Sequence, residues 1–284
     1  MTQNRGIENV QFYREITPDF FYYLGLMATD GSLSGRSVQL GLTDKDVIDW
    51  VVQKLGYLNT VTESPGKKVQ HRTRYWVRFH NREAANVLRF YGVKDRKTYT
   101  LRVNLHDIPI GMYRHFIRGV FDGDGSINTK KHGVEAYITS RSSEFITQIR
   151  DIINNALHFG YDVTRVDRTN GTHYFCYRMY GVPHVGRFGR WIYEGDYYRM
   201  SRKKAELAGI IEEASARKLR GAYWKKDKHK WRAQIKVDRK CIFLGYYKTE
   251  EEAAQAYDKA AVKHFGRRAI LNFPELHCGD CLEL

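Results

Sequence analysis

Two short segments of this chain end in the same polar sequence, Asp-Gly-Ser, after an apolar stretch with a central glycine. Residues 23–33 read YLGLMATDGSL, and residues 117–127 read IRGVFDGDGSI. The acid before the shared glycine is Asp30 in the first copy and Asp124 in the second. Carboxylates bind hard cations such as Mg²⁺, which complete their coordination with water and phosphate oxygens. If the fold brings the two acids together, they could hold metal against a phosphate-containing substrate.

Both segments are predicted to be helices, although a glycine in the middle of a helix costs about 1 kcal/mol relative to alanine. A helix accepts that cost where another backbone must come close. We therefore expect the two helices to pack in parallel through Gly25 and Gly119. Each should end at its Asp-Gly pair, with the glycine in a left-handed cap.

This arrangement would place two carboxylates at helix C-termini, where the macrodipole disfavours negative charge and like charges repel each other. A divalent cation is the natural compensation. The simpler alternative is a pair of ordinary exposed turns, which a single Asp-Gly sequence would not exclude. The duplication favours a functional pair.

The elements that position these acids are duplicated as well. The first copy is followed by a strand-like stretch at 37–42, a helix start at 43–44 and a strand at 75–79, and the second by counterparts at 134–139, 142–143 and 174–179. Ser, Thr or Asp before an apolar run of helical period indicates an N-cap. Each unit therefore reads α-β-β-α-β-β-α, and we expect an α+β fold with two pseudo-symmetric units.

The overall charge indicates a polyanionic partner. Among 284 residues, 47 Lys and Arg outnumber 32 Asp and Glu, which gives a net charge of +15. Nucleic acid is the commonest polyanion that such a surface attracts, although a merely soluble basic protein is the simpler alternative. No stretch is apolar and long enough to predict a membrane span.

The N-terminal residues contain no apolar secretory signal. Four cysteines in a chain of this length cannot form a disulfide scaffold, and they fit a reducing compartment. We expect an intracellular, cytoplasmic protein, with an organellar or phage origin left open.

The strongest basic run lies near the C-terminus. Residues 217–240 contain eleven Lys or Arg against two acids. Strands are expected at 232–237 and 241–246, followed by a helix that Thr249 and Glu252 open as a capping box and that Gly266 ends. A short linker near 214–219 would precede this small β-β-β-α module.

The two Asp-Gly segments resemble the defining motif of the LAGLIDADG homing endonucleases, in the single-chain form that carries two copies. The resemblance covers residues 19–206. The matching positions are Gly25, Leu26, Asp30 and Gly31 in the first copy and Gly119, Asp122, Asp124 and Gly125 in the second. Two positions depart from the motif, because Ala28 replaces an earlier acid in the first copy and Arg118 occupies a normally small position in the second.

The resemblance implies a site-specific DNA endonuclease whose catalytic Asp30 and Asp124 bind Mg²⁺, with Mn²⁺ or Ca²⁺ able to replace it for binding. Metal-activated water would attack one phosphodiester on each strand, while the metal stabilises the leaving oxygen. A basic side chain near each site usually assists. Lys97 and Lys203 stand at comparable places in the two units, although ordinary solvated lysines are the alternative interpretation.

The same resemblance implies that the antiparallel strands form a saddle in the major groove of double-stranded DNA, where all four base pairs are distinguishable. Alternation puts Arg72, Arg74 and Arg78 on one face of their strand. The expected counterparts in the second unit are Lys130, Lys131, Arg165, Arg168 and Arg178. Because one chain carries both units, we expect a monomer.

Residues 220–274 resemble the DNA-binding domain of plant ethylene-response factors, the APETALA-two type. The matching text is GAYWKKDKHKWRAQI, then FLGYYKTEEEAAQAYDKAAVKHFG and LNFPE. That family folds as a three-stranded sheet on one helix, with the sheet in the major groove. Its DNA-facing positions correspond here to Tyr223, Lys225, Gln234, Lys236 and Phe243, and alternation along the second strand puts Arg232 on the same face. Several of these are Arg or Trp in the family, so we expect more phosphate contact than base reading.

The expected domains are a first LAGLIDADG unit at 1–108, a second at 109–213, the linker at 214–219, the APETALA-two-type domain at 220–275 and a tail at 276–284. The tail contains His277, Cys278 and Cys281. One C-x-x-C without a second ligand pair does not predict a zinc site, and we expect this tail to be disordered.

Two other functions use the same scaffold without cleavage: a DNA-binding regulator and an intron-RNA maturase. The presence of both motif aspartates disfavours them, because binding alone needs no paired acids at helix ends. An intein is disfavoured because the chain begins with Met1 and ends at Leu284 without a terminal His-Asn.

Overall fold

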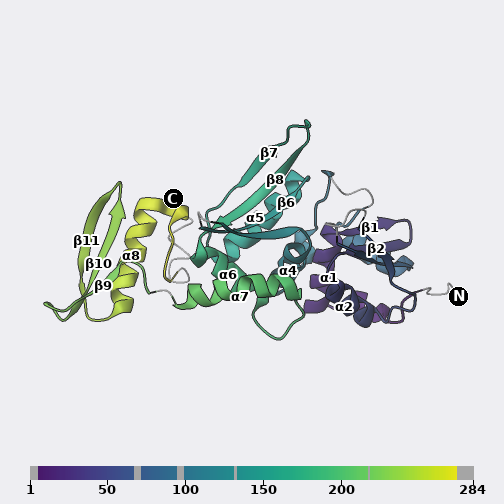
Figure 1. The fold of residues 1–284 in the computed structure, drawn as a ribbon, viewed down its shortest axis with the longest axis horizontal. Helices are drawn as coiled ribbons and strands as arrows, with labels where there is room; N and C mark the ends of the chain where they lie inside the picture. Colours follow the sequence, from purple (N-terminus) through teal and green to yellow (C-terminus); the bar gives the residue numbers. More distant parts are fainter. Residues whose placement is uncertain (1–5, 67–71, 95–98, 131–132, 217, 274–284) are drawn as a thin grey trace. The chain divides into compact units, whose positions relative to one another are not determined.

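A computed structural model describes residues 6–66, 72–94, 99–130, 133–216 and 218–273 (Figure 1). The chain divides into two compact units. The first comprises Met1–Arg150 and Val163–Glu212, and the second comprises Asp151–Asp162 and Glu213–Leu284. Both predicted repeats contribute to the first unit. Within the described ranges, no helix combines the length and apolar character needed to cross a membrane.

The first repeat follows a short 3-10 helix, η1 (Val10–Tyr13), and has the predicted order of elements. They are α1 (Pro18–Thr29), β1 (Gly31–Ser34), β2 (Ser37–Leu42), α2 (Lys45–Leu55), β3 (Thr62–Ser64), β4 (Arg74–His80) and α3 (Arg82–Phe90). The strands form an antiparallel sheet in the order β1-β2-β4-β3. Val38 and Leu40 of β2 are buried, and so are Val77 and Phe79 of β4. The alternation predicted for the strand that carries Arg78 is therefore confirmed.

The second repeat follows two short 3-10 helices, η3 (Leu105–Asp107) and η4 (Ile110–Met112), and repeats the same order. Its elements are α4 (Tyr113–Asp124), β5 (Gly125–Lys130), β6 (Gly133–Ser140), α5 (Ser143–Leu157), β7 (Val163–Asp167), β8 (His173–Tyr180) and α6 (Val182–Tyr193). Their sheet order, β5-β6-β8-β7, is that of the first sheet. A further helix, α7 (Ser201–Ala216), follows, so residues 214–216 form its last turn and not a linker.

The backbones of α1 and α4 touch at the two predicted glycines. A Cβ placed on Gly25 would lie 2.3 Å from the carbonyl oxygen of Phe116, and one on Gly119 would lie 2.0 Å from the carbonyl oxygen of Tyr22. The contacts run from Tyr22 with Gly119 to Thr29 with Gly123. Residue numbers rise together in both helices, so the helices pack in parallel. Arg118 does not prevent this approach, because its guanidinium lies over the ring of Tyr22, 4.9 Å from the centroid.

The glycines after the two aspartates differ from the sequence prediction. Neither Gly31 nor Gly125 has a positive φ, and Gly125 is extended at φ −78° and ψ 155°. The left-handed cap was therefore a wrong prediction, because each helix passes directly into a strand. Glycine is needed there for space: a Cβ would lie 2.7 Å from Met27 Cα at Gly31 and 2.5 Å from the Phe121 carbonyl oxygen at Gly125.

The C-terminal module has the predicted β-β-β-α order. It contains β9 (Ala222–Lys225), β10 (Lys230–Val237), β11 (Lys240–Tyr247), α8 (Glu250–Phe265) and a 3-10 turn, η5 (Gly266–Arg268). The capping box of Thr249 and Glu252 is formed. Ala233 and Ile235 are buried in the small hydrophobic clusters that include residues of α8, so this side of β10 packs on the helix.

We expect Gly119→Ala to lower the free energy of unfolding by about 1–3 kcal/mol, because the new methyl group meets backbone that cannot move aside. Gly209→Ala is the matched control, since Gly209 lies in α7 and a Cβ there meets no atom within 4 Å. The control should be neutral or stabilise the helix by up to about 1 kcal/mol. Urea unfolding of both variants measures the difference, and equal stabilities would contradict the close backbone contact.

Candidate functional site

The parallel pairing of α1 and α4 brings their C-terminal ends together, and with them the two predicted carboxylates. Asp124 is the last residue of α4, and Asp30 follows the last residue of α1. A Cβ on Gly123 would lie 2.1 Å from Thr29 Oγ1 and 2.9 Å from Asp30 Oδ2. The Asp30 carboxylate therefore lies against the residue that precedes Asp124.

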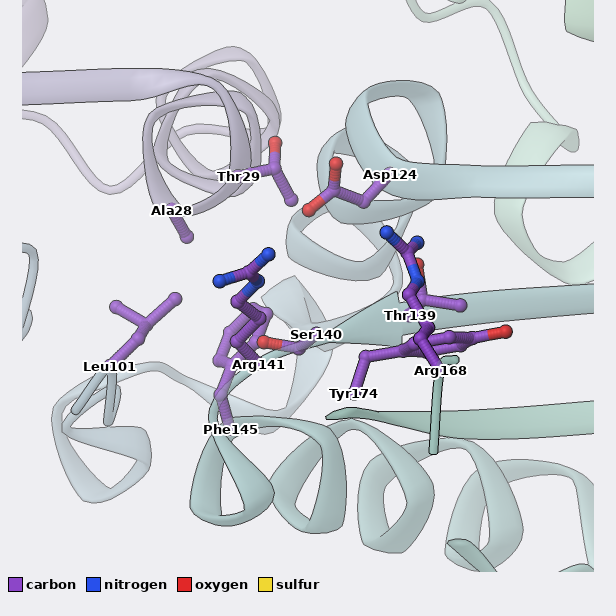
Figure 2. Close-up of a pocket in the computed structure, with 10 residues that line it drawn as sticks. All are labelled: Ala28, Thr29, Leu101, Asp124, Thr139, Ser140, Arg141, Phe145, Arg168 and Tyr174. Atoms are coloured by element: carbon purple, nitrogen blue, oxygen red, sulfur yellow. The ribbon is translucent and has the colours of Figure 1, made fainter. Parts of the chain in front are cut away.

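Asp124 lines a pocket of about 270 Å³, which lies between the two helix ends and the second sheet. Its lining residues are Ala28, Thr29, Leu101, Asp124, Thr139, Ser140, Arg141, Phe145, Arg168 and Tyr174. Figure 2 shows the guanidinium groups of Arg141 and Arg168 directed toward the side of the pocket that contains Asp124 and Thr29. Arg168 was predicted as a DNA contact, whereas Arg141 carries no sequence signal, because only the fold places it here.

Asp30 has a different neighbour. Arg74 Nη2 lies 3.1 Å from Asp30 Oδ1, with 42% of the arginine side chain and 20% of the aspartate side chain exposed. The same arginine donates to the carbonyl oxygen of Gly41 from Nε at 3.2 Å and from Nη2 at 2.8 Å, and it lies over the ring of Trp76. Arg74 was predicted to face DNA, but the structure directs its guanidinium to the carboxylate.

The donor set at these helix ends fits Mg²⁺. Hard oxygen ligands suit this ion, which is usually held by one or two carboxylates and keeps several waters or substrate phosphates. Within the described residues, no group of three or more His, Cys, Asp and Glu could enclose a metal. A metal held here would therefore need oxygen ligands from water and from a bound phosphate.

Lys203 lies inside the protein, beneath the end of α4. Its ammonium donates to the carbonyl oxygens of Phe121 and Asp122, at 2.8 Å for Asp122. These carbonyls belong to the last turn of the helix, where a cation offsets the macrodipole. Burial lowers the pKa of Lys203 to about 8. Lys97, its predicted counterpart, lies outside the described residues.

A second motif acid fixes the same helix end from within. Asp122 is 1% exposed. It accepts hydrogen bonds from Tyr22 Oη at 2.8 Å, from the Met200 amide at 3.1 Å and from the Tyr193 hydroxyl. Burial raises its pKa, and these donors oppose the rise. Asp122 therefore ties α1, α4 and the segments after them together.

Two of the predicted DNA-facing arginines are structural counterparts. Arg78 pairs in register with Gln39, and Arg178 pairs with Tyr137. Arg78 donates to Gln39 Oε1 at 2.7 Å, while Arg178 lies over the Tyr137 ring and pairs with Glu135. Each is held by a neighbour on its own sheet.

The remaining predicted residues of the two repeats are distributed as follows. Arg72 is exposed just before β4, and Arg165 forms an ion pair with Asp167 on the edge strand β7. Lys130 ends β5, and Lys131 lies outside the described residues.

The predicted DNA-facing residues of the C-terminal module share one face of its sheet. Arg232 is opposite both Tyr223 and Tyr246, and Gln234 is opposite Phe243. The two predicted aromatic residues, Tyr223 and Phe243, are each 50% exposed. Lys225 lies two residues after Tyr223 on β9, and Lys236 lies two residues after Gln234 on β10, so both belong to the same face. Tyr246, 40% exposed, belongs to this face but was not predicted.

A family model described as a LAGLIDADG-like domain matches residues 111–193, which cover the second repeat from just before α4 to the end of α6. The C-terminal module matches a different group. An AP2-like ethylene-responsive transcription factor of Arabidopsis thaliana is 51% identical over 49 residues, which are 17% of this chain and 16% of that protein. Both resemblances predicted from the sequence are confirmed.

A probable translation initiation factor IF-2 of Methanocaldococcus jannaschii is 23% identical over 256 residues, which cover 86% of this chain and 20% of that protein. The chain spans less than a third of the length of these curated relatives.

Solved structures are similar at low identity. Full-length DUF199/WhiA from Thermatoga maritima has a TM-score of 0.47 and 12% identity, over 77% of this chain and 68% of that chain. Mesophilic variants of the homing endonuclease I-DmoI have a TM-score of 0.43 and 14% identity, over 71% of this chain and 100% of that chain.

The buried ammonium of Lys203 predicts a pH-dependent contribution to stability. Its pKa falls from the ordinary value of 10.5 to about 8, so between these values the unfolded chain binds more protons than the folded protein. The unfolding free energy of the wild type, relative to Lys203→Met, should therefore rise by about 1–3 kcal/mol from pH 8 to 10.5 and stay level below pH 8. Urea unfolding across this range measures it, with the exposed neighbour Lys204→Met as control. A difference independent of pH would contradict the burial of this charge.

Proposed function

We propose that this chain is a metal-dependent endonuclease that cuts both strands of a double-stranded DNA site, with its C-terminal module as an additional DNA-binding element. The observation that carries the proposal is the meeting of Asp30 and Asp124 at the adjoining ends of two parallel helices. Two carboxylates placed where helix dipoles and mutual repulsion both disfavour them need a cation as compensation. Two such acids, one from each repeat, correspond to the two strands of a duplex.

Asp30 and Asp124 would hold the Mg²⁺ ions. When bound, the metal would supply an activated water and stabilise the leaving oxygen. Arg141 and Arg168 would hold a phosphate of the DNA in the pocket beside Asp124, because each guanidinium group can donate two parallel hydrogen bonds to phosphate oxygens. Lys203 and Asp122 would not contact the substrate. Both are buried, and they would keep the end of α4 and its carboxylate in place.

The basic surface supports DNA as the substrate. The net charge of +15 favours a polyanion, and two antiparallel sheets carry Arg78 and Arg178 at equivalent positions. The relatives of the C-terminal module are transcription factors by name, which supports the same partner. Tethering a second binding element to the repeats raises its effective concentration at the DNA, so it can add affinity without being highly selective.

One observation favours a second candidate, DNA binding without cleavage. Asp30 already has a protein cation, Arg74, within 3.1 Å, and a carboxylate neutralised in this way has less need of a metal. The two candidates make opposite predictions for the substitution of the aspartates.

We expect Asp30→Asn and Asp124→Asn each to abolish double-strand cleavage while DNA binding is retained, because the amide keeps the shape of the side chain but loses the charge that holds a cation. The substrate is the DNA that flanks this reading frame, joined without the frame, with and without Mg²⁺. Gel electrophoresis separates intact, nicked and cut DNA, and mobility shift measures binding.

Wild-type cutting by either aspartate variant would remove that acid from the mechanism. Binding of the joined DNA without any Mg²⁺-dependent cutting by the wild type would establish the non-cleaving alternative.

The sheet face of the C-terminal module should contribute to the salt dependence of DNA binding. Replacing Lys225, Arg232 and Lys236 together by Gln should weaken binding and make the slope of log K against log salt shallower by about 2–3, since each phosphate that the protein no longer neutralises reduces the slope by about 0.9. The charge-matched control replaces Lys248, Lys259 and Lys263, which are exposed at the turn before α8 and along that helix. Equal slopes for the two triple variants would contradict DNA binding by this face.

A further inference from the structure

The two repeats can be superposed residue by residue through their strand registers. In the first sheet Gly31 pairs with Leu40 and Leu40 with Val77, and in the second sheet Gly125 pairs with Ile138 and Ile138 with Tyr177. Val77 and Tyr177 are therefore equivalent, and so are the residues three positions before them, Arg74 and Tyr174.

This equivalence exposes a chemical difference between the halves. In the first half, the strand position nearest the carboxylate holds a cation, whose Nη2 lies 3.1 Å from Asp30 Oδ1. In the second half the same position holds an uncharged ring that lines the pocket of Asp124 (Figure 2). The ring of Tyr174 instead lies beneath Arg168, at 5.0 Å from centroid to guanidinium carbon.

Arg74 is held in its position by more than the carboxylate. Its Nε and Nη2 both donate to the Gly41 carbonyl oxygen, and its guanidinium carbon lies 4.7 Å from the centre of the Trp76 ring. In the second repeat, Gly41 and Trp76 correspond by register to Thr139 and Cys176. The backbone carbonyl of Gly41 has an equivalent in Thr139, but the aromatic anchor has none, so the ring contact is as specific to the first half as the arginine itself.

We propose that Arg74 is a built-in counter-ion that competes with a divalent cation for Asp30 and so sets the metal affinity of the first half alone. A cation that binds Asp30 must share or displace an ion pair that the protein has already formed. The equivalent strand position of the second half is the uncharged Tyr174, and the cations of the Asp124 pocket, Arg141 and Arg168, come from positions just after the strands β6 and β7. For cleavage, the inference rests on the proposed function; for metal binding, it does not.

The test separates the two halves by removing one carboxylate at a time from the full chain. Asp124→Asn leaves Asp30 as the acid under test, and Asp30→Asn leaves Asp124. Mn²⁺ alone is the probe, and its binding is measured by the loss of the free-ion electron paramagnetic resonance signal. Adding Arg74→Gln to Asp124→Asn should raise Mn²⁺ affinity about three- to tenfold, whereas adding it to Asp30→Asn should not change the affinity.

Arg78→Gln in the Asp124→Asn background is the charge-matched control. Arg78 lies on the same strand and bonds to Gln39 and not to an aspartate, so Mn²⁺ affinity should stay as it was. If Arg74→Gln does not fold, Arg74→Lys replaces it. Lysine keeps the positive charge but lacks the planar guanidinium that lies over Trp76 and bonds Gly41 through two nitrogens, so a smaller gain in affinity is expected.

Equal effects of Arg74→Gln in the two backgrounds, or no effect in either, would overturn the proposal. If the wild-type chain cuts DNA, Arg74→Gln should also shift the ratio of the two nicked strands at limiting Mg²⁺, and an unchanged ratio would count against the proposal. Failure of the chain to cut any DNA would remove the proposed function, but the Mn²⁺ comparison would still decide the role of Arg74.

Discussion

The close approach of two helix backbones is the constraint on which the rest of the structure depends. Gly25 and Gly119 leave no room for a Cβ, because each would meet a carbonyl oxygen of the other helix within 2.3 Å. Only at this spacing do the C-terminal ends of α1 and α4 adjoin and bring Asp30 and Asp124 to one place. The two sheets follow from the ends of these helices, so the same contact sets where each basic strand lies relative to the acids.

The interior around this contact is unusually polar, and its polar groups serve the helix ends. Buried Asp122 accepts hydrogen bonds from three donors in other segments, and buried Lys203 donates to two carbonyl oxygens in the last turn of α4. Both groups cost free energy to bury, which partners offset only when they are well placed. Burying Asp122 and Lys203 has a functional reason if the end of α4, and with it Asp124, must be held in a fixed position. The pseudo-symmetry ends at the next layer, where the position of Arg74 in the first half is occupied by Tyr174 in the second.

Repetition made much of the fold predictable. The order of elements, the strands β2, β4, β6 and β8, the capping box at Thr249 and the close approach of the two glycines all follow from local patterns that occur twice or match a known module. The left-handed caps at Gly31 and Gly125 were wrong, since one glycine can be needed for conformation or for space and the sequence does not distinguish them. Arg141 and Tyr22 were missed because their partners are distant in sequence. Tyr246 was missed because a bulge opposite Ala233 and Gln234 breaks the alternation and puts it on the same face as Phe243. Lys203 was predicted to assist catalysis, with a solvated lysine as the alternative, and its burial could not be predicted from a run of basic residues.

The central claim is that Asp30 and Asp124 together hold divalent metal against a DNA duplex. Crystals of the full chain with its DNA site and Mn²⁺, measured at the manganese absorption edge, test this most directly. We predict anomalous peaks within coordination distance of both carboxylates and of backbone phosphates on the two strands. A complex with bound DNA whose Asp30 and Asp124 carry no such peak would contradict the account and leave a protein that binds DNA without metal chemistry.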